Sequence, residues 1–117
     1  MKKDPLEEYI FNIIGFSGMA KYYASEAIKN AREGNFKESE ELFKKSDEEF
    51  SKAQDAEGAL AKNRNEVSKE CDELILIHSQ DHFMGTMTYR ELAKEMIEMS
   101  KKINELEKSL NEKIDKI

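Results

Sequence analysis

The two histidines of this 117-residue chain, His78 and His82, are four residues apart, with Asp81 directly before the second. Residues three and four apart share one face of a helix, so these three side chains are predicted to lie together. Gly85 continues the same stripe and leaves it open, because glycine has no side chain. If the chain carries out chemistry, we expect that chemistry at this cluster.

Three interpretations of the cluster are open. A histidine near the start of a helix can be a partly buried structural residue or a cap. Histidines at i and i+4 also match a zinc-ligand spacing, but the run lacks the glutamate of a zinc protease and further ligands. A neutral imidazole is, in addition, a good nucleophile toward phosphorus. We favour this third interpretation, in which His78 carries a phosphoryl group and Gln80 or His82 donates hydrogen bonds to its oxygens.

Asp81 fits a phosphate site poorly, because a bare carboxylate repels phosphate. It is therefore expected to orient a neighbour or to bind a cation. A helix N-terminus close to His78 would add partial positive charge to the site.

The composition predicts a soluble helical protein with a single domain over residues 1–117. Glycine (5) and proline (1) are scarce and 38% of the residues are charged, which is typical of long helices. The net charge of −6 is spread along the chain, which argues against a nucleic-acid partner. We expect no membrane insertion, because the chain has no apolar run of the required length and no signal peptide. The lone Cys71 cannot form an internal disulfide, which suits the cytoplasm.

The apolar pattern predicts an all-α fold, an antiparallel three-helix up-down-up bundle with helices near residues 5–33, 35–65 and 72–115. Gly34 is expected to end the first helix and Asn35 to cap the second. An apolar column runs along one face of the predicted first helix. It consists of Leu6, Ile10, Ile13, Ala20, Ala24, Ala27 and Ala31. The second helix is expected to bury Phe36, Phe43, Phe50, Ala53 and Leu60, with Ser39 and Ser46 between them.

The third helix carries a regular apolar stripe that is typical of a coiled coil. This stripe consists of Leu92, Met96, Met99, Ile103, Leu106, Leu110, Ile114 and Ile117. A bundle of three helices is thin, and we expect self-association to bury the apolar residues that one bundle cannot cover.

The histidine run resembles the motif of a known family. The lactose/cellobiose family of enzyme IIA proteins, from the bacterial sugar phosphotransferase system, has a pattern similar to Leu76-Ile77-His78-Ser79-Gln80-Asp81-His82-Phe83-Met84. The stretches 15–20, 31–36 and 88–93 support the resemblance, which covers about residues 6–105. Ser79, Phe83 and Gly85 depart from the residues that are usual in the family.

The resemblance implies a three-helix subunit that assembles as a homotrimer. It implies that His78 takes a phosphoryl group on Nε2 from the histidine phosphocarrier protein and passes it to a cysteine of a IIB component. The transfer would serve the uptake of a β-linked disaccharide such as lactose, cellobiose or chitobiose, and the sugar stays open because a IIA component does not contact it. His82 and Gln80 would support the transfer, and Asp81 of each chain would share a divalent cation, expected to be Mg²⁺, at the trimer axis.

A non-catalytic helical interaction module is the alternative. The stretch 31–36, followed by Ser39 and Phe43, is also similar to the helix–turn–helix units of repeat scaffolds, in which a groove binds a partner helix. The chain has no 34-residue repetition, however, and this alternative leaves the histidine run unexplained.

Overall fold

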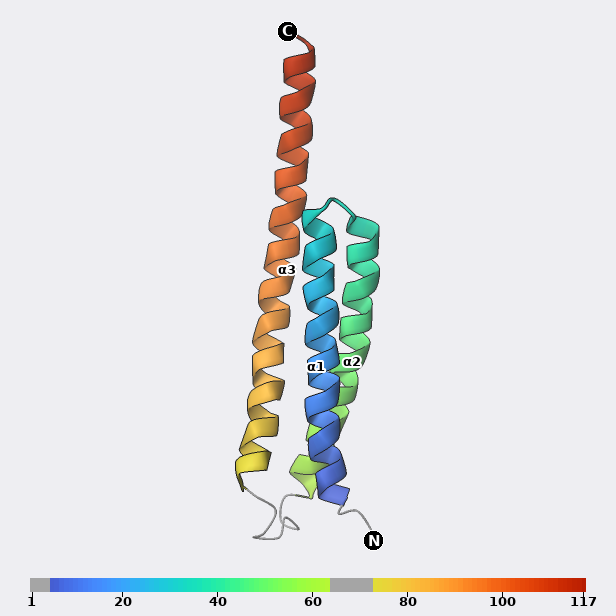
Figure 1. Cartoon of the computed structure of the whole chain (residues 1–117), viewed down its shortest axis with the longest axis vertical. Coiled ribbons are helices and arrows are strands. Elements are labelled where there is room, and N and C mark those ends of the chain that lie inside the picture. The colour runs from blue at the N-terminus through green and yellow to red at the C-terminus, as the bar shows by residue number, and fades with distance from the viewer. Residues whose placement is uncertain (1–4, 64–72) are drawn as a thin grey trace.

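The computed structural model of the chain describes residues 5–63 and 73–117, which form three long helices (Figure 1). The helices are α1 (Pro5–Arg32), α2 (Phe36–Lys62) and α3 (Glu73–Asp115). Their directions alternate, with α2 returning beside α1 and α3 running alongside α1 in the same direction as α1 (Figure 1). The predicted all-α, up-down-up bundle is therefore confirmed, and the described residues contain no strand. Cys71 and the predicted first residue of the third helix, residue 72, lie outside the described residues.

The turn between α1 and α2 depends on Gly34, which ends α1 as predicted. Its φ of +85° lies in the left-handed region that glycine enters at little cost. The N–H of Asn35 donates to Asn30 O at 2.8 Å and the N–H of Gly34 to Ala31 O at 3.0 Å, the bond pair of a Schellman motif. Asn35 takes the N-cap position of α2, as predicted, and its side chain makes no cap hydrogen bond.

The second helix ends earlier than the predicted residue 65, because Asn63 terminates it. The Asn63 N–H donates to Leu60 O at 3.1 Å, and its side-chain amide donates to Ala59 O at 2.8 Å. Both bonds satisfy carbonyls of the last turn that would otherwise lack a helical partner.

The first helix lies at the centre of the bundle and packs against both other helices. Its predicted apolar column is buried throughout, and its alanines let the neighbouring backbone approach closely. On α2, Phe50, Ala53 and Leu60 are buried as predicted, whereas Phe36 and Phe43 are only partly buried. The backbones of α2 and α3 stay apart, and large side chains bridge them; for example, the rings of Phe50 and Phe83 stack with centroids 5.1 Å apart.

The third helix packs within the chain through a different stripe from the regular one singled out in the sequence. All eight residues from Leu92 to Ile117 in that regular stripe are at least 50% exposed. The residues of α3 that are buried are Leu76, Ser79, Phe83, Thr86, Arg90 and Ala93. Within the chain, the regular stripe is thus left exposed, and a stripe interrupted by polar residues packs against the other helices.

Two polar residues of this second stripe, Thr86 and Arg90, form hydrogen bonds with the other helices. Ser46 of α2 donates to Ala20 O of α1 at 2.7 Å and accepts from Arg90 Nε of α3 at 3.0 Å. The other end of the Arg90 guanidinium forms an ion pair with Asp47, and its flat face lies 4.7 Å from the ring centroid of Phe50. One arginine thus links all three helices at a single level of the bundle.

Replacing Arg90 by methionine should lower the free energy of unfolding by about 1.5–3 kcal/mol, because methionine keeps most of the apolar contact but loses the charged hydrogen bonds. Lys94→Met is the matched control, since Lys94 is exposed on the same helix and its loss should cost no more than about 0.5 kcal/mol. Urea unfolding followed by circular dichroism at one protein concentration measures both variants. Equal losses in the two variants would show that Arg90 does not hold the helices together.

Candidate functional site

The two histidine side chains meet on the surface of α3, about two turns after its first residue, Glu73. Their ring centroids are 4.6 Å apart and their planes are inclined by 83°, so the edge of one ring faces the other. Both rings are exposed, as is the carboxylate of Asp81 beside them. The structure therefore brings His78, Asp81 and His82 together, as their spacing predicted.

These side chains border an open pocket of about 310 Å³ between α1 and α3. Gly18 of α1 and Gly85 of α3 lie on its two sides, and a Cβ added at either glycine would meet no heavy atom within 4 Å. Both glycines thus face open space, and the pocket has room for a tetrahedral phosphoryl group. Thr86, at its floor, is buried and donates a hydrogen bond to Ser17 O at 3.1 Å.

Lys21 is a lining residue that the sequence reasoning missed. It comes from α1, one turn beyond Gly18, and its ammonium lies 5.3 Å from the ring centroid of Tyr89 on α3. Lys21 brings a permanent positive charge to the same pocket as the two imidazoles. No local motif identifies it, because it is far from His78 in the sequence and only the packing of α1 on α3 brings the two together.

Gln80 does not line this pocket, although it was predicted as a donor to the phosphoryl group. Each residue of an α-helix is turned by about 100° from the one before, so Gln80 and His82 lie on opposite sides of Asp81. Within one chain, the Gln80 amide is therefore on the other flank of α3 from the pocket.

Two departures from the family motif face the interior of the chain. Ser79 is fully buried, and its hydroxyl donates to Leu76 O at 2.7 Å, so it is not a free donor for the pocket. Phe83 stacks on Phe50 in the core. The third departure, Gly85, lines the pocket.

A cation site can be tested against the residues of a single chain. Within residues 5–63 and 73–117, no three metal-ligating side chains lie close enough to share an ion. A carboxylate oxygen suits Mg²⁺, but Asp81 alone supplies too few ligands. The residue fits a metal site only if several copies of the chain bring their Asp81 side chains together.

The electrostatics of the pocket favour an anion that is carried by a histidine. Two imidazoles and one ammonium line the pocket together with a single carboxylate, so the groups that can bind an anion outnumber the one that repels it. The helix N-terminus adds little, because His78 lies beyond the first turn, where the dipole effect is concentrated. Lys21, rather than a helix end, supplies the positive charge at this pocket.

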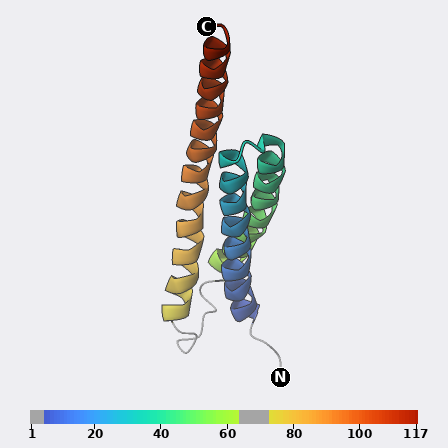
Figure 2. The same ribbon diagram turned by 45° about the horizontal axis from the view of Figure 1, so that its top comes forward.

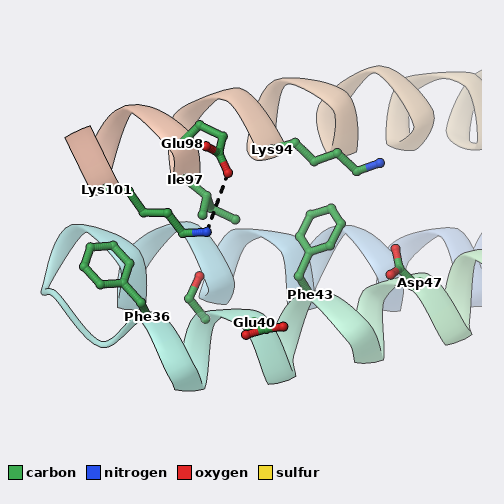
Figure 3. Close-up of a pocket in the computed structure, with 9 residues that line it drawn as sticks. Phe36, Glu40, Phe43, Asp47, Lys94, Ile97, Glu98 and Lys101 are labelled. Carbon is green, nitrogen blue, oxygen red and sulfur yellow. Dashed lines mark ion pairs between the residues drawn. The ribbon is translucent and has the colours of Figure 1, made fainter. Parts of the chain in front are cut away.

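A second hollow of about 250 Å³ lies between α2 and α3, toward the turn at Gly34 (Figure 3). Phe36 and Phe43 line one side of it, and Lys94 and the Lys101–Glu98 ion pair (3.6 Å) line the other (Figure 3). Its lining contains neither histidine nor cysteine, so it offers no nucleophile for phosphoryl transfer.

The chain matches the model of the family described as "PTS system, Lactose/Cellobiose specific IIA subunit" over residues 8–101. The lichenan-specific phosphotransferase enzyme IIA component of Bacillus subtilis (strain 168) is 35% identical to it over 102 residues, which are 87% of this chain and 93% of that protein.

Two solved structures have the same fold. The cellobiose-specific enzyme IIA from Bacillus anthracis superposes with a TM-score of 0.79 at 32% identity, covering 88% of this chain and 94% of that one. The IIA(Chitobiose) protein of Escherichia coli, solved in complex with HPr, superposes with a TM-score of 0.68 at 29% identity, covering 88% and 99%.

A helical bundle that exposes paired histidines beside a lysine defines a candidate carrier of phosphoryl groups. This chain belongs to the lactose/cellobiose-specific IIA family of the sugar phosphotransferase system, and is a phosphotransferase component of that class. Membership of this family excludes the alternative that the chain is a non-catalytic helical interaction module. Among the described residues, no helix is both long enough and apolar enough to span a bilayer.

Replacing Lys21 by glutamine should slow phosphorylation of the chain by about 10–100-fold. Loss of one charge-stabilising donor costs roughly 10²–10³-fold in enclosed sites, and solvent reduces that effect in an open pocket. The control is Lys29→Gln, an exposed lysine farther along α1 that does not line the pocket. Initial rates of phosphate incorporation at several salt concentrations give the comparison. If both variants react at the wild-type rate, Lys21 has no part in the site.

Proposed function

We propose that His78 accepts a phosphoryl group from the histidine phosphocarrier protein and passes it to a cysteine of a IIB component. The observation that carries this proposal is the pocket in which His78, His82 and Lys21 meet. The similar Escherichia coli IIA(Chitobiose) protein, which forms a complex with HPr, supports the choice of donor. The role serves uptake of a β-linked disaccharide and requires a cytoplasmic location, because phosphoenolpyruvate, the source of the phosphoryl group, is made there.

The transfer consists of two in-line displacements at phosphorus. The lone pair of a ring nitrogen of His78, expected to be Nε2, attacks the phosphorus of the phosphorylated donor. The bond between phosphorus and the donor's imidazole breaks, and that imidazole leaves with the bonding electron pair. A cysteine thiolate of the IIB component then attacks the same phosphorus, and His78 leaves as the free imidazole. Lys21 and His82 stabilise the negative charge on the phosphoryl oxygens in both steps.

Both partners dock over the mouth of the pocket. Phe11 and Tyr22 share the face of α1 that carries Gly18, because they lie seven residues before it and four after it. Phe11 is 65% exposed and Tyr22 is 54% exposed, and Ile75 beside His78 is 42% exposed. These apolar side chains offer a small contact surface, which suits partners that must bind and leave in turn.

The chain acts as a homotrimer in which the exposed stripe of α3 faces the threefold axis. Ile77 and Met84, at 51% and 57% exposed, flank Asp81 on this face and lead into the regular stripe from Leu92 onward. Three Asp81 carboxylates would then meet at the axis, where like charges need a counter-ion. A shared Mg²⁺ fits, because oxygen ligands suit this hard cation.

In such a trimer, Gln80 would act from a neighbouring chain. One flank of α3 faces the opposite flank of the next copy, so Gln80 of one chain comes toward His78 of another. Assemblies that mix His78→Ala with Gln80→Leu chains test this arrangement. They should transfer faster than pure Gln80→Leu assemblies, because a His78→Ala chain supplies the missing amide to its neighbour. No gain on mixing would mean that Gln80 does not act across chains.

Replacing His78 by alanine should abolish transfer, because the nucleophile is lost. His82→Ala should slow transfer by roughly 10²–10³-fold, because only one donor is lost. The measurement is incorporation of labelled phosphate from phosphoenolpyruvate in the presence of the upstream phosphotransferase proteins. The label should be labile in acid and stable in alkali, unlike a phosphoserine at Ser79. Label retained by a folded His78→Ala chain, or none in the wild type, would refute the proposed function.

Replacing Asp81 by leucine should tighten self-association when metal is absent, because three like charges are removed from the axis. In the same variant, added Mg²⁺ should no longer affect assembly. Sedimentation of wild type and Asp81→Leu, with Mg²⁺ or with a chelator, measures both effects, and Asp55→Leu on the exposed face of α2 is the control. A wild type that stays monomeric at tens of micromolar under both conditions would contradict the axial arrangement.

A further inference from the structure

An aromatic ring of α3 contacts the lysine that lines the phosphoryl pocket. The ammonium of Lys21 lies 5.3 Å from the ring centroid of Tyr89, within the range of a cation–π attraction. Lys21 borders the pocket together with His78 and His82, whereas Tyr89 does not border it. One conformation of Lys21 thus rests against the ring and borders the pocket at the same time.

The directions of α1 and α3 explain why both side chains approach the pocket. Both views of the ribbon show α1 and α3 side by side, with their chains running the same way (Figure 1, Figure 2). Side chains of a helix lean toward its N-terminal end. Lys21 therefore leans toward Gly18, three residues before it, and Tyr89 leans toward Gly85, four residues before it. Since both glycines line the pocket, the ammonium and the ring lean toward the same end of it.

The Lys21 side chain needs such a contact to stay at the pocket. It is exposed, and none of the ion pairs among residues 5–63 and 73–117 involves it. A lysine side chain is long and flexible, so an exposed one samples many rotamers. Tyr89 is partly buried and its ring turns about only two bonds, which makes it the better fixed of the two side chains. The ring therefore restricts the positions that the ammonium takes.

We propose that Tyr89 is a positioning residue for phosphoryl transfer, whose ring face keeps the Lys21 ammonium at the pocket before the phosphoryl group arrives. The proposal rests on the proposed function, because it concerns the same reaction at His78. With the ammonium already in place, less conformational freedom is lost in the step in which it stabilises the phosphoryl oxygens. Tyr89 acts only through Lys21, since it does not border the pocket itself.

The face of the ring, rather than the phenolic hydroxyl, is the part of Tyr89 that has this role. A cation near an aromatic face is attracted by the quadrupole of the ring, which phenylalanine also has. Tyr89→Phe should therefore keep the contact with Lys21. Tyr89→Leu should lose it, although leucine keeps an apolar side chain at this partly buried position.

The first measurement is the initial rate of phosphorylation of the full-length chain by the upstream phosphotransferase proteins. Tyr89→Leu should react about two- to fivefold more slowly than the wild type, which is the weight of one exposed cation–π contact, and Tyr89→Phe should match the wild type. Phe16→Leu is the matched control, because it removes the ring from another lysine contact, Lys52 to Phe16 at 5.5 Å, outside the pocket lining. Its rate should be unchanged, and an unchanged rate of Tyr89→Leu would overturn the proposal.

A second comparison separates positioning from a merely structural role. The double variant Lys21→Gln/Tyr89→Leu should be no slower than Lys21→Gln alone, because the ring acts only through the ammonium. A further two- to fivefold loss in the double variant, about the size of one cation–π contact, would overturn the proposal. Circular dichroism of each variant checks that the helices are retained.

NMR of the unphosphorylated chain tests the contact without any reaction. The ring should shift the resonances of the protons next to the Lys21 ammonium in the wild type and in Tyr89→Phe, and this shift should be absent in Tyr89→Leu. Its absence from the wild type would overturn the proposal. If the wild type accepts phosphate on His78 and Tyr89→Leu does so equally fast, only the positioning role is refuted. A wild type that accepts no phosphate refutes the proposed function, and the positioning role with it.

Discussion

Arg90 and Ser46 fix the position of α3 along the other two helices, and the phosphoryl site depends on that register. A purely apolar interface would tolerate a slip of one turn, because each apolar residue would meet another. A slip of α3 would break the bonds from Arg90 to Ser46 and from Thr86 to Ser17 O, and the bond from Ser46 to Ala20 O fixes α2 on α1 in the same way. Since Ser17 immediately precedes Gly18 and Ala20 immediately precedes Lys21, the same bonds set Gly18 and Lys21 opposite His82 and Gly85.

The small side chains of α1 determine what the bundle leaves uncovered. The alanines from Ala20 to Ala31 allow α1 and α2 to pack so closely that Ser39 reaches Ala27 O at 2.7 Å. A bundle this thin covers only one face of α3. The opposite face keeps its apolar stripe exposed. The close packing of α1 on α2 therefore also explains why this face of α3 is available for self-association.

Much of this arrangement follows from sequence pattern, because local rules act strongly where they apply. The α1 column and the turn at Gly34 were predictable, since burial period and left-handed backbone leave clear signatures. The face of α3 that is buried against the other helices was not predictable in this way. Its regular stripe is the stronger pattern, but the chain packs through residues such as Thr86 and Arg90, whose partners on other helices cannot be read from α3 alone. For the same reason His78 and His82 were found as a pair, whereas Lys21 needed the packing of α1 on α3 to be recognised.

The most direct test is to locate the phosphoryl group in the phosphorylated chain by NMR, correlating phosphorus with the ring nitrogens of both histidines. We expect one phosphorus–nitrogen bond, to Nε2 of His78, with chemical-shift changes for the side chains of His82 and Lys21 that contact the phosphoryl oxygens. Phosphorus bound to His82, or bound to His78 without any change at Lys21, would contradict the site formed by α1 and α3.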